Sequence, residues 1–257
     1  MALLNFQQTG KGENLVLIHG LFGRLENLNM VAKSLSQDYL VTNIDVRNHG
    51  LSFHENNMEY AVLAQDIIDT LDHLNIDSTH ILGHSMGGKI AMQVALDFPK
   101  RVNKLIVADI SPVQYPQHHN QIIAGLKSID LSSLNNRKQA DEQLAHYVDE
   151  LGVRQFLLRN LHKVEDKFVF KCNLNFIAQC YGQIIKGYQQ NNVFSKPTLF
   201  IKGANSDYIT ADHRPLISRL FPNSKAKIIQ GAGHWLHAEK TVAFNNTVRS
   251  FLTHQKQ

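Results

Sequence analysis

Residues 79–92 read THILGHSMGGKIAM, and this stretch decides the fold. A short apolar run ends at Gly83, and a helical pattern begins after Ser85. Gly83, Ser85 and Gly87 form a G-x-S-x-G motif. In a turn between a strand and a helix, this motif strains the serine backbone and exposes its hydroxyl at the end of the strand. The stretch therefore predicts a nucleophilic Ser85 on an α/β scaffold, with a helix N-terminus that favours developing negative charge.

Apolar, strand-like runs alternate with helical patterns on both sides of this turn. Continuous apolar runs are typical of parallel strands covered on both faces, and here they lie at 14–19, 39–45, 79–84, 104–110, 197–203 and 226–231. Helical patterns lie at 27–36, 60–74, 87–97, 211–220 and 238–253. The alternation predicts a mostly parallel, doubly wound α/β sheet. The opening LLNFQQ predicts an antiparallel edge hairpin of that sheet.

The alternation is interrupted once, between residues 112 and 195. This segment shows short amphipathic helical patterns, and KFVF at 167–170 is its one strand-like run. Because both of its ends return to the same sheet, we expect an insertion and not a separate domain. We predict a core of residues 1–111 and 196–257, and a helical cap of residues 112–195 inserted after the sixth strand. The cap is expected over the carboxyl edge of the sheet, where open α/β sheets bind ligands.

The composition of the 257-residue chain is that of an ordinary globular enzyme, with 43% hydrophobic and 19% charged residues. The formal net charge of +4 comes from scattered lysines and arginines, so we expect no nucleic-acid partner. No apolar run approaches the length of about 18 residues that predicts a membrane span, and the amino terminus lacks a secretory signal pattern. On one helix Cys172 and Cys180 would lie about 12 Å apart, too far for a disulfide. Two reduced thiols predict a cytoplasmic location; the sequence does not predict the oligomeric state.

A serine nucleophile needs a base, and GAGHWLHAEK at 231–240 offers His234. Gly231 and Gly233 suit a tight loop that presents the imidazole, which takes and returns a proton near neutral pH. His237 is the alternative, but it lies at the start of the last helix, where a packing role is expected. No nearby acid completes a metal ligand set with this histidine pair. We expect no metal and no other cofactor.

The acid that orients the base is ambiguous from the residues alone. Asp109 ends the run LIVAD, and Asp207 follows LFIKG in GANSDYIT, so both lie at carboxyl ends of predicted strands. Ser206 is expected to add a hydrogen bond to the acid–base pair. Three further acids, Asp66, Asp69 and Asp72, are expected on the solvent face of a helix.

The loop LVLIHGLFG at 15–23 is the candidate for an oxyanion hole. Its backbone can face the serine turn, so we expect hydrogen-bond donors from the amides of Leu21 and Met86. His19 is expected to brace this loop and not to act in catalysis. Phe22, Trp235 and Tyr208 neighbour the predicted catalytic loops and are candidates for an apolar acyl pocket, with packing in the core or cap as the alternative.

Four motifs together resemble the α/β-hydrolase fold family. They are HGLFG at 19–23, DVRNHG at 45–50, GHSMGG at 83–88 and GAGH at 231–234, and their chain order is that of the family. HGLFG, DISP, KGANS and GAGHWLHAEK make the chain most similar to the YbfF-type esterases within that family. The resemblance covers nearly the whole chain and is weakest in the cap.

This resemblance also bears on the acid. Family members commonly carry the acid three residues after the glycine that ends the seventh strand, whereas Asp207 comes four residues after Gly203. The one-residue shift favours Asp109, a position that some related hydrolases use.

The resemblance implies a serine esterase that hydrolyses small or medium acyl esters or thioesters through a Ser85–His234–Asp109 triad and an acyl-enzyme. Its partner is then a small-molecule ester or thioester. The same fold also hosts carbon–carbon bond hydrolysis and cofactor-free lyase reactions, so these remain alternatives. A non-catalytic ligand-binding protein on this scaffold is the second alternative.

Overall fold

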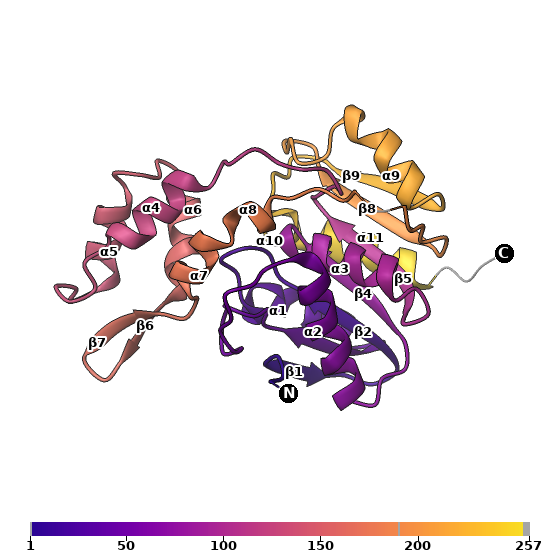
Figure 1. Ribbon diagram of the computed structural model, residues 1–257, viewed down its shortest axis with the longest axis horizontal. Helices are drawn as coiled ribbons and strands as arrows, with labels where there is room; N and C mark the ends of the chain where they lie inside the picture. The colour runs from indigo at the N-terminus through magenta and orange to yellow at the C-terminus, as the bar shows by residue number, and fades with distance from the viewer. Residues whose placement is uncertain (1, 190, 254–257) are drawn as a thin grey trace.

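The computed structural model describes residues 2–189 and 191–253. Within these residues, seven strands form one sheet in the order β1-β3-β2-β4-β5-β8-β9 (Figure 1). The strands are β1 (Phe6–Thr9), β2 (Glu13–Ile18), β3 (Tyr39–Ile44), β4 (Thr79–His84), β5 (Val102–Ala108), β8 (Thr198–Gly203) and β9 (Ser224–Ile229). β1 pairs antiparallel to β3, and the other neighbouring pairs are parallel. The predicted doubly wound α/β fold and its antiparallel edge are confirmed. The predicted hairpin is wrong, because β1 pairs with β3 and not with β2, the next strand along the chain.

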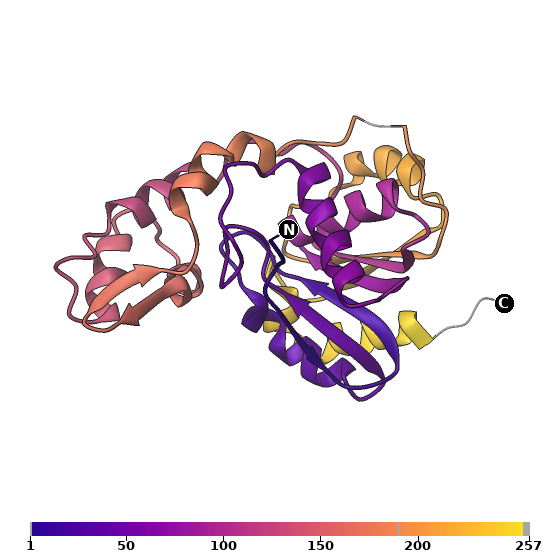
Figure 2. The same ribbon diagram turned by 60° about the horizontal axis from the view of Figure 1, so that its bottom comes forward.

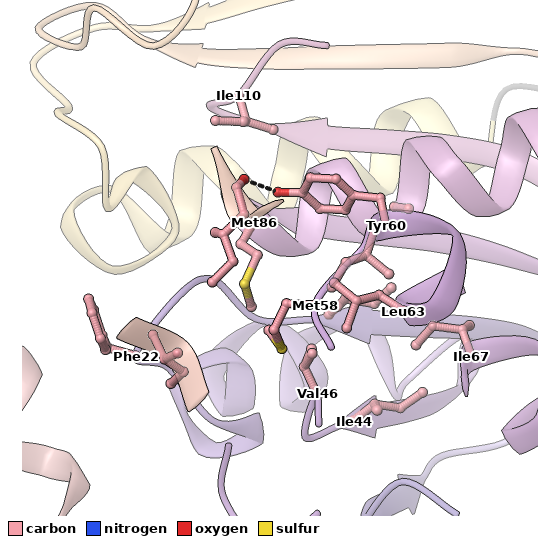
Figure 3. Packing of buried hydrophobic residues seen from close by; sticks show 14 of the residues in the cluster. Phe22, Ile44, Val46, Met58, Tyr60, Leu63, Ile67, Met86 and Ile110 are labelled. Carbon is pink, nitrogen blue, oxygen red and sulfur yellow. Dashed lines mark hydrogen bonds between the residues drawn. The ribbon is translucent and has the colours of Figure 1, made fainter. Parts of the chain in front are cut away.

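The two faces of the sheet are covered by different helices (Figure 2). Leu15 and Leu17 of β2 belong to a core with α1 (Asn29–Leu35) and α11 (Thr241–Thr253). Val16 and Ile18 belong to a core with α2 (Tyr60–His73), α3 (Met86–Asp97) and α9 (Arg214–Leu220). Figure 3 shows part of this second core. Successive strand side chains point to opposite faces, which is why a continuous apolar run marks each buried strand. The helices that flank the sheet are α1, α2, α3, α9, α10 (Leu236–Glu239) and α11.

The segment between β5 and β8 extends to one side of the sheet (Figure 1). It contains α4 (Asn120–Ser128), α5 (Arg137–Leu144), α6 (Leu151–Leu157), β6 (Leu161–Val164), β7 (Lys167–Phe170), α7 (Leu174–Gln179) and α8 (Tyr181–Ile184). Short 3₁₀ turns are η1 (Leu25–Leu28), η2 (Leu158–Asn160) and η3 (Ala211–His213).

The structure differs from the predicted segment in two respects. The segment between β5 and β8 follows the fifth strand along the chain, and the prediction of a sixth strand before it is wrong. In the described residues, β1 to β5 are the strands that precede the segment. The run KFVF is half of an antiparallel hairpin, in which β6 pairs with β7. The polar sequence LHKV of β6 gave no strand signal. The division into a core (1–111 and 196–257) and a cap (112–195) stays a prediction, and residues 1, 190 and 254–257 of it lie outside the described residues.

Neither a membrane-spanning helix nor a disulfide is found in the part of the chain that the structure describes. None of its helices combines the length and the apolarity needed to cross a bilayer. Cys172 precedes α7 and Cys180 follows it, and both thiols are free and buried.

Candidate active site

Ser85 lies in the turn between β4 and α3, with φ 54° and ψ −123°. A positive φ is costly for a residue with a side chain, so the surroundings must hold this conformation in place. The turn is tight enough to need glycine on both sides. A Cβ at Gly83 would lie 2.0 Å from the carbonyl oxygen of Gly87, and one at Gly87 would lie 2.2 Å from that of Ile18. The glycines therefore allow β4, α3 and β2 to approach one another closely, and the turn places Ser85 at the end of β4.

His234 lies between Ser85 and Asp109. Its Nε2 is 3.0 Å from Ser85 Oγ, and its Nδ1 is 2.8 Å from Asp109 Oδ2. Because a carboxylate only accepts hydrogen bonds, Nδ1 donates and Nε2 is free to accept the serine proton. The Tyr208 ring stacks on the imidazole, with centroids 4.0 Å apart. Burial holds the pKa of His84 well below its ordinary value of 6.5, and its neutral ring donates from Nε2 to the His234 carbonyl at 2.8 Å.

Asp109 follows β5 and is fully buried, with φ 51°. One carboxylate oxygen accepts the Gly203 amide at 2.9 Å, and the other accepts both the His234 imidazole and the Ser206 hydroxyl. The structure therefore distinguishes between the two candidate acids, Asp109 and Asp207. Asp207 is exposed, and among the described residues its carboxylate makes no hydrogen bond or ion pair. The structure brings Ser85, His234, Asp109 and Ser206 into one hydrogen-bonded chain and leaves Asp207 out of it.

Leu21 and Met86 both lie beside Ser85. Met86 is the first residue of α3, so its N–H has no acceptor within the helix. Leu21 lines the same two cavities as Ser85. Leu21 and Met86 thus both lie at cavity walls that Ser85 shares, and their role as oxyanion donors stays a prediction.

Two neutral histidines brace the loop that carries Leu21. His19 Nδ1 donates to the Gly20 carbonyl at 2.8 Å, and its Nε2 accepts the Val46 amide at 3.0 Å. His49 Nε2 accepts the Phe22 amide at 3.2 Å, and burial lowers the pKa of His49 to about 3. His19 thus has the bracing role that the sequence predicted, whereas His49 was missed.

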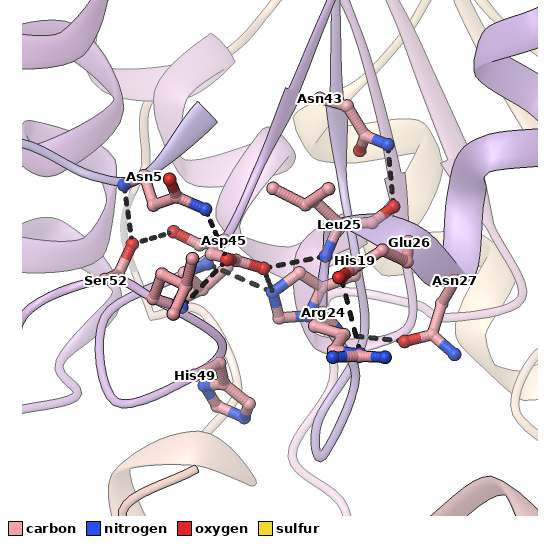
Figure 4. Close-up of polar contacts among 12 residues, drawn as sticks. Asn5, His19, Arg24, Leu25, Glu26, Asn27, Asn43, Asp45, His49 and Ser52 are labelled. Atoms are coloured by element: carbon pink, nitrogen blue, oxygen red, sulfur yellow. Dashed lines mark hydrogen bonds and ion pairs between the residues drawn. The ribbon is translucent and has the colours of Figure 1, made fainter. Parts of the chain in front are cut away.

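Beneath this loop lies the buried carboxylate of Asp45 (Figure 4). It accepts the Leu25 amide at 2.7 Å, the Leu51 amide at 3.0 Å and the Asn5 side-chain amide at 2.7 Å. Three donors to one buried carboxylate fix the loop relative to β3. The motif DVRNHG at 45–50 therefore helps to position the loop that carries Leu21.

A cavity of about 440 Å³ opens beside Ser85 and His234. Phe22, Tyr208 and Trp235, the three predicted pocket residues, all line it. Trp235 also contacts Phe156 of α6, with ring centroids 5.4 Å apart. The segment between β5 and β8 therefore supplies part of the wall, and the volume is typical of a small-molecule site.

Comparison with known proteins identifies the family. Residues 13–241 match the model of the alpha/beta hydrolase fold family. The chain belongs to the α/β-hydrolase family. It is 38% identical over 239 residues to the esterase YbfF of Escherichia coli, a match that covers 93% of this chain and 92% of that protein. It is 40% identical over 246 residues to the sn-1-specific diacylglycerol lipase ABHD11 of Mus musculus, covering 93% and 80%. A solved structure, a marine microorganism esterase, superposes with a TM-score of 0.95 at 40% identity, covering 98% of this chain and 100% of that one. The predicted resemblance is confirmed.

Lys89 is a residue of this α/β hydrolase that the sequence analysis missed. It lies on α3, one turn after Ser85, and is 1% exposed. Its ammonium group donates to the carbonyls of Val113 at 2.7 Å and Lys186 at 2.6 Å. These carbonyls belong to the two chain segments that enter and leave the region between β5 and β8. The one available signal was a lysine within MGGKIAMQVAL, a helical segment whose other residues are apolar or glycine except for Gln93.

Asp66 corrects a second expectation. Its helix was expected to present Asp66, Asp69 and Asp72 to solvent, but Asp66 is buried. Both of its oxygens accept hydrogen bonds from the Arg47 guanidinium, from Nε and from Nη2, each at 2.6 Å. Helical periodicity cannot reveal this pair because Arg47 comes from a loop 19 residues away.

His237 takes the packing role that was expected for it. Its ring is buried and contacts His84, with centroids 4.4 Å apart. Burial lowers the pKa of His237 to about 4, so the ring is neutral at pH 7. Within residues 2–189 and 191–253, no three histidine, cysteine, aspartate or glutamate side chains are grouped so that they could hold a metal ion.

Proposed function

We propose that this protein is a carboxylic ester hydrolase with Ser85 as its nucleophile. The observation that carries the proposal is the hydrogen-bonded chain from Ser85 Oγ to His234 Nε2, at 3.0 Å, and from His234 Nδ1 to Asp109 Oδ2, at 2.8 Å. Family membership and the esterase names of the similar proteins support it. A non-catalytic receptor has no need of a base aligned on a strained serine.

In the proposed reaction, Ser85 Oγ attacks the ester carbonyl while His234 Nε2 takes the hydroxyl proton. The carbonyl oxygen becomes an oxyanion, which the amides of Leu21 and Met86 stabilise. His234 then gives its proton to the leaving alcohol, and the acyl group stays on Ser85. A water molecule, deprotonated by His234, attacks this acyl-enzyme and releases the acid, so that one ester and one water give one acid and one alcohol.

The proposed substrates are small-molecule esters, with thioesters as a further class because the same steps release a thiol. Carbon–carbon bond hydrolysis and a cofactor-free lyase reaction are the alternatives on this fold. A panel of esters, thioesters and diketones separates them. We propose residues 112–195 as the cap over this site. We propose the cytoplasm as the location, because both cysteines are free, buried thiols.

The proposal is tested by Ser85→Ala together with a fluorophosphonate probe. We expect the variant to lose about 10⁴-fold or more in kcat for aryl acetate hydrolysis, and the probe to label the parent enzyme at Ser85 alone. Ser36→Ala is the matched control, because its exposed hydroxyl bonds only the Lys33 carbonyl at the end of α1. An unlabelled parent, or a Ser85→Ala variant as active as Ser36→Ala, would refute the proposed function.

A further inference from the structure

Two cavities meet at Ser85, and they differ greatly in size. The larger has a volume of about 440 Å³, and the smaller has about 30 Å³. Both are lined by Ser85 and Leu21, the nucleophile and a proposed oxyanion donor. An ester carbonyl bound at Ser85 has its acyl chain on one side and its alcohol on the other. Each half of the substrate must therefore occupy one of the two cavities.

The position of His234 decides which half goes where. His234 lines the larger cavity and does not line the smaller one. Its Nε2 must reach the leaving oxygen to protonate it. The alcohol half therefore extends into the larger cavity, and the acyl chain points away from His234, past Met86, into the smaller cavity.

The walls of the smaller cavity are fixed. Tyr60, Ile110, Tyr181 and Ile184 line it, and each is at most 5% exposed. Figure 3 shows Tyr60 and Ile110 within the buried hydrophobic cluster. The Tyr60 hydroxyl donates to the Ile184 carbonyl at 2.5 Å, which joins α2 to α8 across the cavity. The Tyr181 hydroxyl accepts the His119 amide at 3.0 Å. Well-packed walls with satisfied polar groups resist the expansion that a longer chain would require.

The volume of the smaller cavity limits the length of the acyl chain that it can hold. A cavity needs about 10–15 Å³ for one water-sized group, so about 30 Å³ holds two such groups. An acetyl or propionyl chain fits, and a hexanoyl chain does not. By contrast, the larger cavity is in the range of about 300–1,000 Å³ that accommodates a whole small molecule.

We propose that the enzyme is selective for short acyl groups, acetyl and propionyl, carried on bulky alcohols. This inference rests on the proposed ester hydrolysis at Ser85. It assigns Ile184 as a residue that sets the acyl-chain limit, because its buried side chain lines the smaller cavity and does not line the larger one.

A series of esters of one aryl alcohol, with acyl chains of two to ten carbons, tests the proposal on the parent enzyme. We expect kcat/KM to be highest for acetate or propionate and at least about tenfold lower for hexanoate, since one methylene that does not fit costs about tenfold or more. A parent enzyme that prefers octanoate or decanoate overturns the proposal.

Ile184→Ala and Ile122→Ala form a matched pair of variants. Both remove the same three carbons, but Ile184 lines the smaller cavity and Ile122 the larger one. We expect Ile184→Ala to move the optimum to butyrate or hexanoate and Ile122→Ala to leave the acyl profile as in the parent. An unchanged optimum in folded Ile184→Ala, or an equal shift in Ile122→Ala, overturns the proposal. If Ile184→Ala does not fold, the parent series decides alone.

Fluorophosphonate labelling distinguishes this inference from the function on which it rests. Labelled Ser85 with hydrolysis of long acyl esters overturns the acyl limit and leaves the esterase proposal standing. A parent enzyme that is neither labelled nor active on any ester refutes both.

Discussion

Replacing Asp109 with asparagine changes the charge of the residue but not its shape. Asp109 Oδ1 accepts the Gly203 amide at 2.9 Å, so an amide nitrogen cannot occupy that side, where two donors would face each other. In Asp109→Asn the side-chain nitrogen must therefore face His234 and Ser206. The Ser206 hydroxyl can rotate to accept it. His234 Nδ1 must then accept as well, which moves the imidazole proton to Nε2.

With the proton on Nε2, His234 cannot accept the proton of Ser85. We expect kcat to fall by about 10⁴-fold, equivalent to about 5 kcal/mol of lost transition-state stabilisation. The effect on KM is expected to be small, because Asp109 is fully buried and lines neither cavity beside Ser85.

The assay compares Asp109→Asn with Asp207→Asn, a matched control in which the same change is made on an exposed carboxylate. Steady-state hydrolysis of an aryl acetate gives kcat and KM, and urea unfolding establishes that each variant is folded. We expect Asp207→Asn to stay within about twofold of the parent, as is usual for surface changes away from a site. A loss below tenfold in Asp109→Asn, or a similar loss in both variants, would refute the argument from the tautomer.

Two further predictions concern stability. Gly83→Ala places a Cβ 2.0 Å from the Gly87 carbonyl oxygen and is expected to lower the free energy of unfolding by about 1–3 kcal/mol or more. In Gly182→Ala the added Cβ has no neighbouring atom within 4 Å, so this variant is expected to stabilise α8 by up to about 1 kcal/mol. Urea denaturation measures both, and equal effects would contradict the steric argument. Burial lowers the pKa of Lys89 from 10.5 to about 7, so between these pH values the unfolded chain holds the proton more tightly and stability rises with pH. Lys89→Met should flatten this rise, by at most about 1.4 kcal/mol per pH unit, and parallel pH profiles of the parent and the variant would contradict it.

The fold and two site residues could be predicted because their signals are local. A buried parallel strand needs a continuous apolar run, and a nucleophile turn needs glycines around its serine. His234 likewise lies in a glycine-flanked loop directly before a helix. The residues alone did not choose between Asp109 and Asp207, since both follow strands at the same sheet edge. The choice of Asp109 depends on the position of Asp207, one residue later in the loop after β8 than the family pattern has its acid. Only the family resemblance supplies that comparison.

What the sequence could not reveal depends on partners that are distant along the chain. Lys89 and Asp66 are ionisable residues in helices, and the sequence predicted that Asp66 faces solvent. Each is buried because polar groups from distant segments form hydrogen bonds with it. The strand β6 reads as a polar segment and forms because β7 supplies its hydrogen bonds. The size of the smaller cavity depends on side chains from α2, α3 and α8, and no local pattern reports it.

Helix α3 links the nucleophile to the selectivity proposed for it. Its first residue, Met86, follows Ser85 and lines the smaller cavity, and one turn later Lys89 holds the carbonyls of Val113 and Lys186. Ile184, which also lines that cavity, lies two residues before Lys186. The chain segment that supplies part of the wall of the smaller cavity is thus hydrogen-bonded to the same helix that positions the serine. Asp109 follows β5 and His234 lies in the loop after β9, and neither is among the hydrogen-bond acceptors of Lys89. Loosening the Lys89 contacts should therefore relax the acyl-chain limit before it disturbs the hydrogen-bonded chain at Ser85.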